Sequence, residues 1–329
     1  MGIPKLLDLL DSAKIPVQLQ DFSGKKIAVD GHCWIFNAMA VYKFRVKRGT
    51  TNPLWLNYLG HRLDELQEHN ITPIIVFDGQ KVPIKQTCYS KRQQKYTKPS
   101  ETEHSLPSAW ESYELVKQSV ELLKNRHIQY IIAPFEADPQ LTHLSITHQV
   151  DAVLSIDSDL LVFGCKLVIF PKRSTGGYYS IRHADIFTIH QPAPTPRHIT
   201  TDLTQFDGTR FRHLCILAGC DYLEGFHNMG LKRLLKMMHE VCDIDEVIRR
   251  LLCREEQADY QRKFENANAG FLYQYVYDPR TKLYMRLHPL PPGKLVFDME
   301  LLGESPRITD VPMHRFNQVS PPKKKERKK

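Results

Sequence analysis

The stretch AVLSIDSDLLVFGCKLVIF, residues 152–170, decides the fold class. It contains two short apolar runs, AVL at 152–154 and KLVIF at 166–170. Continuously apolar runs of this length are typical of strands in a parallel sheet that is covered on both faces. Asp157 and Asp159 follow the first run. Because burying an isolated carboxylate is unfavourable, these two acids are expected to face a counter-charge.

Three further runs of this kind precede the stretch: KKIAVDG (25–31), PIIVFDG (73–79) and YIIAPFEAD (130–138). Helical patterns alternate with the runs, at residues 54–69, 111–125 and 139–148. This alternation predicts βαβ units and a doubly wound α/β fold with a parallel sheet. In such sheets the functional crevice lies beyond the carboxyl ends of the strands.

The second half of the chain has a different character. RFRHLCILAGCDYL (210–223) and GLKRLLKMMHEVC (230–242) predict two helices around a short turn, and HQPAPTPRH (190–198) predicts a surface loop. From about residue 305 the apolar periodicity is lost, which predicts an extended arm and a disordered tail. We therefore predict an α/β core over 1–189, a helical region over 190–304, and an arm and basic tail over 305–329.

Charge, cysteine content and hydropathy restrict the class of protein. The formal charge is +8, and the last seven residues, KKKERKK, carry six basic groups and one acidic group. The seven cysteines are odd in number and form no CxxC pair, which indicates free thiols in a reducing compartment. No apolar run approaches the roughly 18 residues that a membrane span needs. Lys5, Asp8 and Asp11 interrupt the N-terminal segment, so it is no signal peptide.

Acidic residues stand at the ends of the predicted strands. Seven carboxylates converging on one crevice would repel one another unless cations neutralised them. Mg²⁺ is suited to this role because it is held by a few carboxylates and keeps several waters. Two such ions about 4 Å apart would clamp the attacking and leaving oxygens of a phosphoryl displacement. Six of the seven acids stand at strand ends, and Asp221 in the AGCDYL segment is added to them; the six are Asp30, Asp78, Glu136, Asp138, Asp157 and Asp159.

Simpler explanations exist for each acid. A single Asp after a strand is often a turn residue or the N-cap of the next helix. DSDLL also resembles the DxD motif of aspartyl-phosphate phosphatases, in which the first Asp is a nucleophile. In that motif a small hydroxyl residue is expected, whereas Leu160 and Leu161 follow here. The full set favours the metal site, because independent caps would not all fall at the same end of every strand.

Two basic segments are candidate contacts to a polyanion. Residues 79–100 contain six basic residues and no acid, and Lys85 and Arg92 are two helical turns apart. In the segment 222–235, backbone N–H groups after Gly230 and the side chains of Lys232 and Arg233 could contact phosphate. The alternatives are a solvated helix face for the first segment and an ordinary αα-hairpin turn for the second.

At this point the motifs resemble a known family. MGIPKLL, AVDGHCW, VFDG with a basic stretch after it, FEADPQL, DSDLLVFGC and LAGCDYL occur in the order and approximate spacing of the 5′ nucleases, the structure-specific family of flap endonucleases and exonuclease 1. The segments RFRHLCILAGCDYL, CKLVIF and FENANAGFLYQYVYDP are more similar to the exonuclease 1 branch. The resemblance covers roughly residues 1–280, and six ordered motifs are a specific signal.

The resemblance implies a PIN-like nuclease core, a helical arch over about 80–126 and a helix–two-turn–helix over about 210–242 that grips duplex DNA. Its two-metal site would contain all seven acids: Asp157 and Asp159 on one ion, Asp78 on the other, Asp138 between them, and Asp30, Glu136 and Asp221 acting partly through water. Lys85 and Arg92 match the basic pair that contacts the scissile phosphate. Gly2 and His32 match positions near the DNA junction.

The sequence also departs from the family pattern. His32 and Phe36 stand where exonuclease 1 usually has Tyr and His. Gly225 stands where a Ser side chain commonly helps to bind K⁺ at the turn, so the K⁺ that the resemblance implies is in doubt. The arch between Arg92 and Glu136 is shorter than in exonuclease 1, and there is no sliding-clamp box of the Q-x-x-hydrophobic-x-x-aromatic-aromatic kind.

The resulting expectation is a Mg²⁺-dependent 5′→3′ DNA exonuclease, with Mn²⁺ as a substitute ion and 5′-flap endonuclease activity in addition. Its partner would be double-stranded DNA with 5′ ends, nicks, gaps or flaps, and it would act as a monomer in DNA repair or replication. The tail PPKKKERKK (321–329) predicts nuclear localisation. The alternatives are a DNA-junction-binding protein with impaired catalysis and a phosphatase built on the Asp157 pair.

Overall fold

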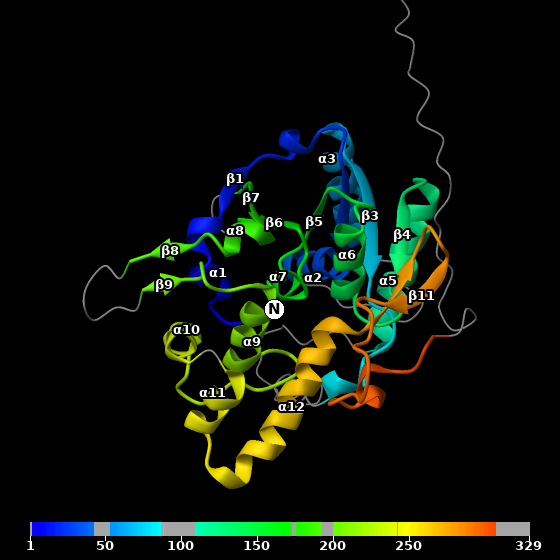
Figure 1. Ribbon diagram of the computed structural model, residues 1–329. Coiled ribbons are helices and arrows are strands. Elements are labelled where there is room, and N and C mark those ends of the chain that lie inside the picture. The colour runs from blue at the N-terminus through cyan, green and yellow to red at the C-terminus, as the bar shows by residue number, and fades with distance from the viewer. Residues whose placement is uncertain are drawn as a thin grey trace, which may run out of the picture.

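A seven-stranded sheet forms the centre of the molecule, in the order β1-β7-β6-β5-β2-β3-β4 (Figure 1). The computed structural model describes residues 2–42, 53–86, 88, 109–172, 176–192, 200–241 and 243–306. The strands are β1 (Ile15–Val17), β2 (Lys26–Asp30), β3 (Thr72–Phe77), β4 (Gln129–Ile132), β5 (Ala152–Leu154), β6 (Leu167–Pro171) and β7 (Tyr178–Arg182).

Five consecutive strands, from β6 to the edge strand β4, are parallel, as the apolar runs predict. β2 pairs with β3 and β5, β3 with β4, and β5 with β6. The sheet is nevertheless mixed, because β7 is antiparallel to β6 and β1 is antiparallel to β7. The prediction of a parallel sheet is therefore correct for these five strands, four of which build the site, and wrong for the antiparallel strands β7 and β1.

Helices cover both faces of the sheet, which explains why the central strands are apolar throughout. Ile27 and Val29 on one face pack in a cluster with α2 (Gly31–Tyr42), α3 (Pro53–Glu68) and α5 (Ala109–Asn125). Ala28 on the other face packs in a cluster with α6 (Ala137–Ile146), α7 (Asp159–Phe163) and α9 (Gly208–Ala218). Alternating side chains of one strand thus enter opposite cores.

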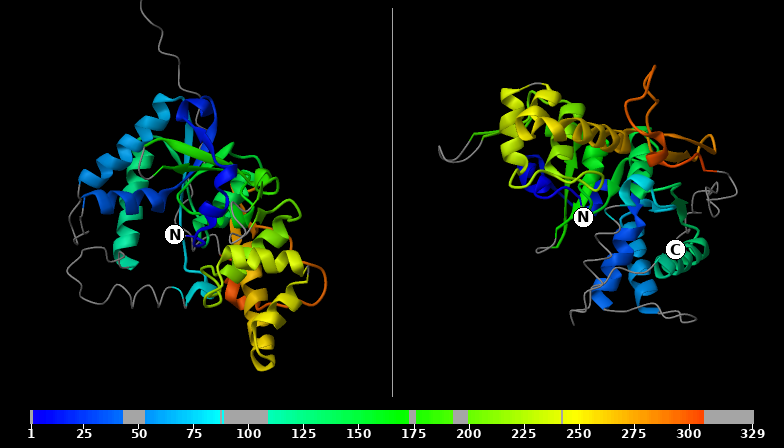
Figure 2. Two further views of the ribbon diagram at one scale, coloured as in Figure 1. Left: turned by 90° about the vertical axis from the view of Figure 1, so that its left-hand side faces the viewer. Right: turned by 90° about the horizontal axis from the view of Figure 1, so that it is seen from below.

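The helical half lies on one side of this core, opposite α3 and α5 (Figure 2). It consists of α9, α10 (Leu231–Glu240), α11 (Ile244–Leu251) and α12 (Arg254–Leu272), followed by the hairpin β10 (Tyr275–Asp278) and β11 (Leu283–Arg286). The two helices expected over about 210–242 are α9 and α10. α10 buries Leu231, Leu234, Leu235 and Met238, so one face of this helix is fixed by packing.

Short elements complete the described structure: α1 (Leu6–Leu9), α8 (His183–Ile186), β8 (His190–Gln191), β9 (Thr201–Asp202) and the 3₁₀ turns Asp11–Ala13, Leu19–Phe22, Pro83–Lys85 and Met299–Leu302. Residues 87 and 89–108 of the predicted arch, Arg92 included, and residues 193–199 of the predicted loop lie outside the described residues, as does the tail from residue 307. No helix of the described segments is both long and apolar enough to cross a membrane.

Candidate active site

The predicted acids gather at the carboxyl ends of four adjacent strands. Asp30 is the last residue of β2, and Asp78 directly follows β3. Glu136 is the N-cap of α6, just after β4. Asp159 begins α7 after β5, with Asp157 two residues before it. Because β5, β2, β3 and β4 are neighbours in the sheet, these acids share one edge.

Electrostatic coupling joins the acids into one cluster. Burial raises the pKa of Asp138 well above its usual range, and Asp157, Asp30 and Glu136 raise it further. Burial likewise raises the pKa of Asp159, with Asp157 and Asp221 adding to the effect. A smaller rise in the pKa of Asp30 has burial as its first cause and Asp78 as its second. The structure therefore brings all seven predicted acids together.

Local hydrogen bonds hold two of the acids in place. Asp30 accepts a bond from the Cys33 thiol at 2.7 Å, and Oδ2 of the same carboxylate accepts one from Ser155 Oγ at 3.0 Å. Asp157 Oδ1 accepts the backbone N–H of Asp159 at 3.0 Å. These contacts fix the side chains without neutralising them, so the charge remains for another partner.

The N-terminal segment lies against the same motif, near α7 and α9 in Figure 1. The backbone N–H of Ile3 donates to Ser158 Oγ at 3.1 Å and to Asp159 Oδ1 at 3.0 Å. Gly2 has a φ of +91°, and a Cβ at this position would lie 2.3 Å from Ser158 Oγ and 2.6 Å from Asp157 Oδ1. Only glycine fits this close approach to the acids.

Asp78 differs from the other acids because its side chain is 48% exposed. Its Oδ1 accepts the backbone N–H of Ala137 at 2.7 Å, at the start of α6. Its own backbone N–H donates to His32 Nδ1 at 3.2 Å. The ring of His32 lies 5.9 Å from that of Phe36, so the two residues that depart from the family pattern form one aromatic pair beside Asp78.

Lys85 is the buried cation of the site. Its Nζ forms an ion pair with Glu136 and another with Asp221 at 2.8 Å, and its side chain is only 10% exposed. Burial alone lowers the pKa of an ammonium, but Glu136, Asp221 and Asp138 outweigh burial and raise the pKa of Lys85 well above its usual value. In this structure Lys85 therefore balances the acids themselves.

The donor set fits a hard divalent cation, because every predicted ligand is a carboxylate oxygen. Within the described segments, no three His, Cys, Asp or Glu side chains are arranged so that they could hold a metal ion as they stand. Mg²⁺ does not need such a cage, since it is usually bound through one or two carboxylates and keeps several waters. Asp78, Asp138, Asp157 and Asp159 are the residues that would hold it.

The predicted duplex contact begins at α10. Gly230 is the N-cap of this helix, and Lys232 and Arg233 are exposed in its first turn. Nη1 of Arg233 donates to the backbone carbonyl of Asn228 at 2.8 Å. At the preceding turn, a Cβ on Gly225 would lie 2.3 Å from the carbonyl oxygen of Ala218, so this backbone has no room for the serine that commonly helps to bind K⁺.

Sequence reasoning missed two residues of the site, Tyr222 and Gln274. Both contact Glu136 through its Oε2 atom. Tyr222 follows Asp221 directly, which is a signal that could have found it. Gln274 is 138 positions from Glu136 and carries no sequence signal for this contact.

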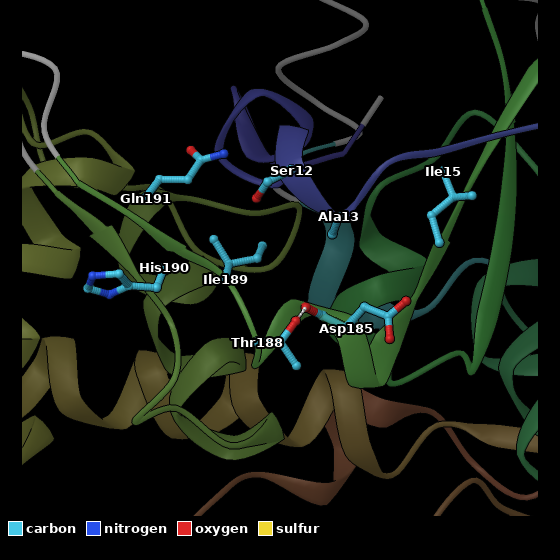
Figure 3. Close-up of a pocket in the computed structure, with 8 residues that line it drawn as sticks. All are labelled: Ser12, Ala13, Ile15, Asp185, Thr188, Ile189, His190 and Gln191. Atoms are coloured by element: carbon cyan, nitrogen blue, oxygen red, sulfur yellow. Dashed lines mark hydrogen bonds between the residues drawn. The ribbon is translucent and has the colours of Figure 1, made fainter.

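A separate pocket of about 330 Å³ shares no lining residue with the acids (Figure 3). Ser12, Ala13 and Ile15 line one side of it, and Asp185 and residues 188–191 line the other. The chemistry of the acids therefore belongs to the strand ends and not to this pocket.

The structure thus combines an α/β core, a row of carboxylates at the strand ends and exposed basic residues at the start of α10. Comparison with known proteins assigns this combination to a family. The XPG N-terminal domain matches residues 1–98, and the XPG I-region matches residues 127–221. Together the two matches cover more than half of the chain. The chain belongs to the XPG-type family of 5′ nucleases.

Relatives and solved structures agree with this assignment. Exonuclease 1 of Arabidopsis thaliana is 31% identical over 321 residues, which are 93% of this chain and 42% of that protein. The DNA damage-inducible protein DIN7 of Saccharomyces cerevisiae is 29% identical over 308 residues, 88% of this chain and 70% of that protein. The catalytic core of Rad2 in complex with DNA substrate shares the fold, with a TM-score of 0.58 at 22% identity, covering 81% of this chain and 79% of that one. This chain thus spans less than half of the Arabidopsis relative.

Proposed function

We propose that this chain is a divalent-metal-dependent, structure-specific 5′ nuclease that degrades duplex DNA in the 5′→3′ direction. The observation that carries the proposal is the convergence of six carboxylates at the ends of four neighbouring strands, with Asp221 of the helical half beside them. The substrates would be duplexes with 5′ ends, nicks or gaps, and cleavage of 5′ flaps would be a second activity. Mg²⁺ is the proposed ion, with Mn²⁺ as a substitute.

The acids would divide into metal ligands and supporting residues. Asp157 and Asp159 would hold one ion and Asp78 the other, with Asp138 between them. Glu136 is a supporting residue, because Lys85, Tyr222 and Gln274 already occupy both of its oxygens. When bound, a pair of divalent ions supplies activation of the attacking water and stabilisation of the leaving 3′ oxygen.

Lys85 would contribute positive charge where charge develops on the phosphate. Its position between Glu136 and Asp221 holds the ammonium at the site and keeps it protonated. Such a preorganised cation in a buried site is worth far more than one in water. Arg92 is proposed as its partner from the family pattern alone.

Several observations support a DNA substrate, a nuclear location and a role in DNA repair. The Rad2 core that shares this fold was solved with a DNA substrate, and the DIN7 relative is named as DNA damage-inducible. The basic tail at 321–329 supports nuclear localisation. Exposed Lys232 and Arg233 at the start of α10 support a duplex-binding role for this helix. A monomer acting in repair or replication is proposed on these grounds.

The test is cleavage of 5′-recessed, blunt and 5′-flap duplexes labelled at either end, with Mg²⁺ or EDTA. Wild-type protein is compared with Asp159→Asn and with Asp185→Asn, a control in the separate pocket. We expect Mg²⁺-dependent release from the 5′ end that is lost in Asp159→Asn and kept in Asp185→Asn. Tight binding without cleavage under Mg²⁺ or Mn²⁺ would instead favour the junction-binding alternative, and hydrolysis of small phosphate esters alone would favour a phosphatase.

A further inference from the structure

We propose that Tyr222 and Gln274 are positioning residues that hold Glu136 in register with the metal-binding acids, and so connect the helical half of the molecule to the reaction. This inference rests on the proposed nuclease function. Neither residue belongs to the acidic set, and neither is expected to touch substrate or metal.

The two residues converge on one oxygen. The Tyr222 hydroxyl donates to Glu136 Oε2 at 2.6 Å, and Gln274 Nε2 donates to the same atom at 3.0 Å. Gln274 Nε2 also lies 2.8 Å from the Tyr222 hydroxyl, so the three groups form a closed triangle. Gln274 is fully buried, Glu136 is 6% exposed and Tyr222 is partly buried, so the triangle is largely shielded from solvent.

The direction of the bonds is fixed by chemistry. Gln274 Nε2 also donates to the carbonyl oxygen of Gly270 at 3.0 Å. Because that carbonyl and the Glu136 carboxylate can only accept, the amide nitrogen must face them. The amide nitrogen carries two N–H groups, so one donates to Gly270 and the other is shared between Glu136 Oε2 and the Tyr222 hydroxyl, which itself donates to Glu136. Burial, followed by the charge of Glu136, raises the pKa of Tyr222 well above its usual value, so the hydroxyl keeps its proton.

The other oxygen of Glu136 faces Lys85. This carboxylate therefore contacts Lys85 on one side and both Tyr222 and Gln274 on the other. Its Oε1 pairs with Lys85 Nζ, and the same ammonium pairs with Asp221, the neighbour of Tyr222 in the chain. The Lys85 Nζ also lies 5.6 Å from the centre of the Tyr222 ring. A shift of Glu136 would therefore move Lys85 and Asp221 together, which places the buried cation under the control of the triangle.

The triangle also joins the two halves of the fold. Glu136 caps α6 in the α/β core, whereas Gln274 lies between α12 and β10. The Tyr222 ring packs edge-on against Phe271 of α12, with ring centres 4.9 Å apart. The position of α12 is thus transmitted to the acidic edge through two side chains.

The test compares Tyr222→Phe and Gln274→Leu with the control Tyr260→Phe. Tyr260 is another tyrosine of the helical half, and among the described residues its buried hydroxyl has no hydrogen-bond partner. Each variant removes hydrogen-bonding capacity while keeping most of the packing. The measurements are the single-turnover cleavage rate at saturating 5′-recessed duplex, the dissociation constant for that duplex, the binding of Mn²⁺ followed by electron paramagnetic resonance, and the unfolding midpoint.

We expect Tyr222→Phe and Gln274→Leu each to lower the single-turnover rate about tenfold and to raise the Mn²⁺ concentration needed for half-saturation. Duplex affinity should stay at the wild-type value, which separates positioning from loss of folded protein. The double variant should lose little more than either single one, because both act on the same oxygen. Tyr260→Phe should match wild type.

The inference is overturned if Tyr222→Phe, which keeps the ring, equals Tyr260→Phe in both rate and Mn²⁺ binding. That outcome in a cleaving wild-type enzyme leaves the nuclease proposal intact. If wild type cleaves no duplex, the nuclease proposal fails, and the Mn²⁺ isotherms of the same variants still decide whether the triangle controls the acids. Should Gln274→Leu fail to fold, Tyr222→Phe alone decides.

Discussion

The acids at the strand ends and the basic residues in the first turn of α10 differ in the sign of their charge and in their exposure to solvent. At the sheet edge, Asp30, Asp157 and Asp159 are each less than a tenth exposed, and burial raises their pKa values. At α10, Lys232 and Arg233 are exposed to solvent. Buried like charges store repulsion that an incoming cation relieves, whereas solvated cations can exchange counterions for phosphates. Under the proposed function, the first region carries out the chemistry and the second binds the duplex.

Lys85 is a cation, but it is buried among the acids. Its removal is expected to have the largest effect on the cleavage rate. Lys85→Met should lower the single-turnover cleavage rate by about 10²–10³-fold, because a buried ammonium aimed at developing charge is lost. Duplex affinity should change far less. Lys14→Met is the control, since Lys14 pairs with Asp11 at 2.9 Å on the surface. An unchanged rate in Lys85→Met would remove this residue from the chemistry.

The close approach of Gly2 to the acids is expected to give the next largest effect. Gly2→Ala places a Cβ against Ser158 Oγ and Asp157 Oδ1, and a misplacement of about 1 Å in a site can cost about 10²-fold in rate. Gly164→Ala is a matched control, because Gly164 has a φ of +92° but a Cβ added there would meet no atom within 4 Å. Both variants place alanine at a φ that favours glycine, so equal activity in the two would contradict a role for the clash.

At α10 the expected effect falls on binding and not on the chemical step. Lys232→Ala combined with Arg233→Ala should weaken duplex binding and reduce the slope of log K against log salt by about 2. The rate at saturating duplex should remain at the wild-type level. Lys166→Ala is the control. The exposed Lys166 directly precedes β6, so it lies at the opposite end of the strands from the acids. A reduced rate with an unchanged salt slope would place α10 within the chemistry and erase the contrast between the two regions.

The smallest effect concerns stability and pH. Asp138 and Asp159 have raised pKa values, first through burial and then through neighbouring acids. Carboxyls of this kind stabilise the metal-free fold below their unfolded pKa of about 4, and that stability is lost as the pH rises through the folded value. Mg²⁺ binds the ionised form, so its stabilisation should grow with pH. Unfolding midpoints measured between about pH 4 and 8, with EDTA or with Mg²⁺, give the pH dependence of this stabilisation. A Mg²⁺-induced rise in the midpoint that is constant across the range would argue against a cluster of acids with raised pKa values.

Much of the core was predictable because of how its strands are buried. β2 and β3 are buried on both faces, so each is an unbroken apolar run that ends in or just before an acid. β1 offers no such signal, because it has three residues, one of them Pro16, and Ile15 is 51% exposed. β7 is mostly buried but contains Ser180 and two tyrosines in place of an unbroken apolar run, and its antiparallel direction is not visible in the sequence.

The candidate site was predictable where a residue has a place in a local pattern. Each metal acid follows a strand or an apolar helix, so its neighbours reveal it. Gln274 contacts Glu136 only because α12 packs against the core, and no local pattern encodes that contact. Lys85 was predicted as a phosphate contact, and its ion pairs with Glu136 and Asp221 depend on the folded geometry.

Counting bound Mn²⁺ shows whether the acids at the carboxyl ends of β5, β2, β3 and β4 form a divalent-metal site. Electron paramagnetic resonance of free Mn²⁺ would be followed in the presence of a 5′-recessed duplex, for wild type, Asp159→Asn and the Lys232→Ala and Arg233→Ala double variant. We expect saturable binding of two ions to wild type and to the double variant, and weaker binding or fewer ions for Asp159→Asn. Saturable binding that is identical in wild type and Asp159→Asn, or absent from wild type, would contradict it.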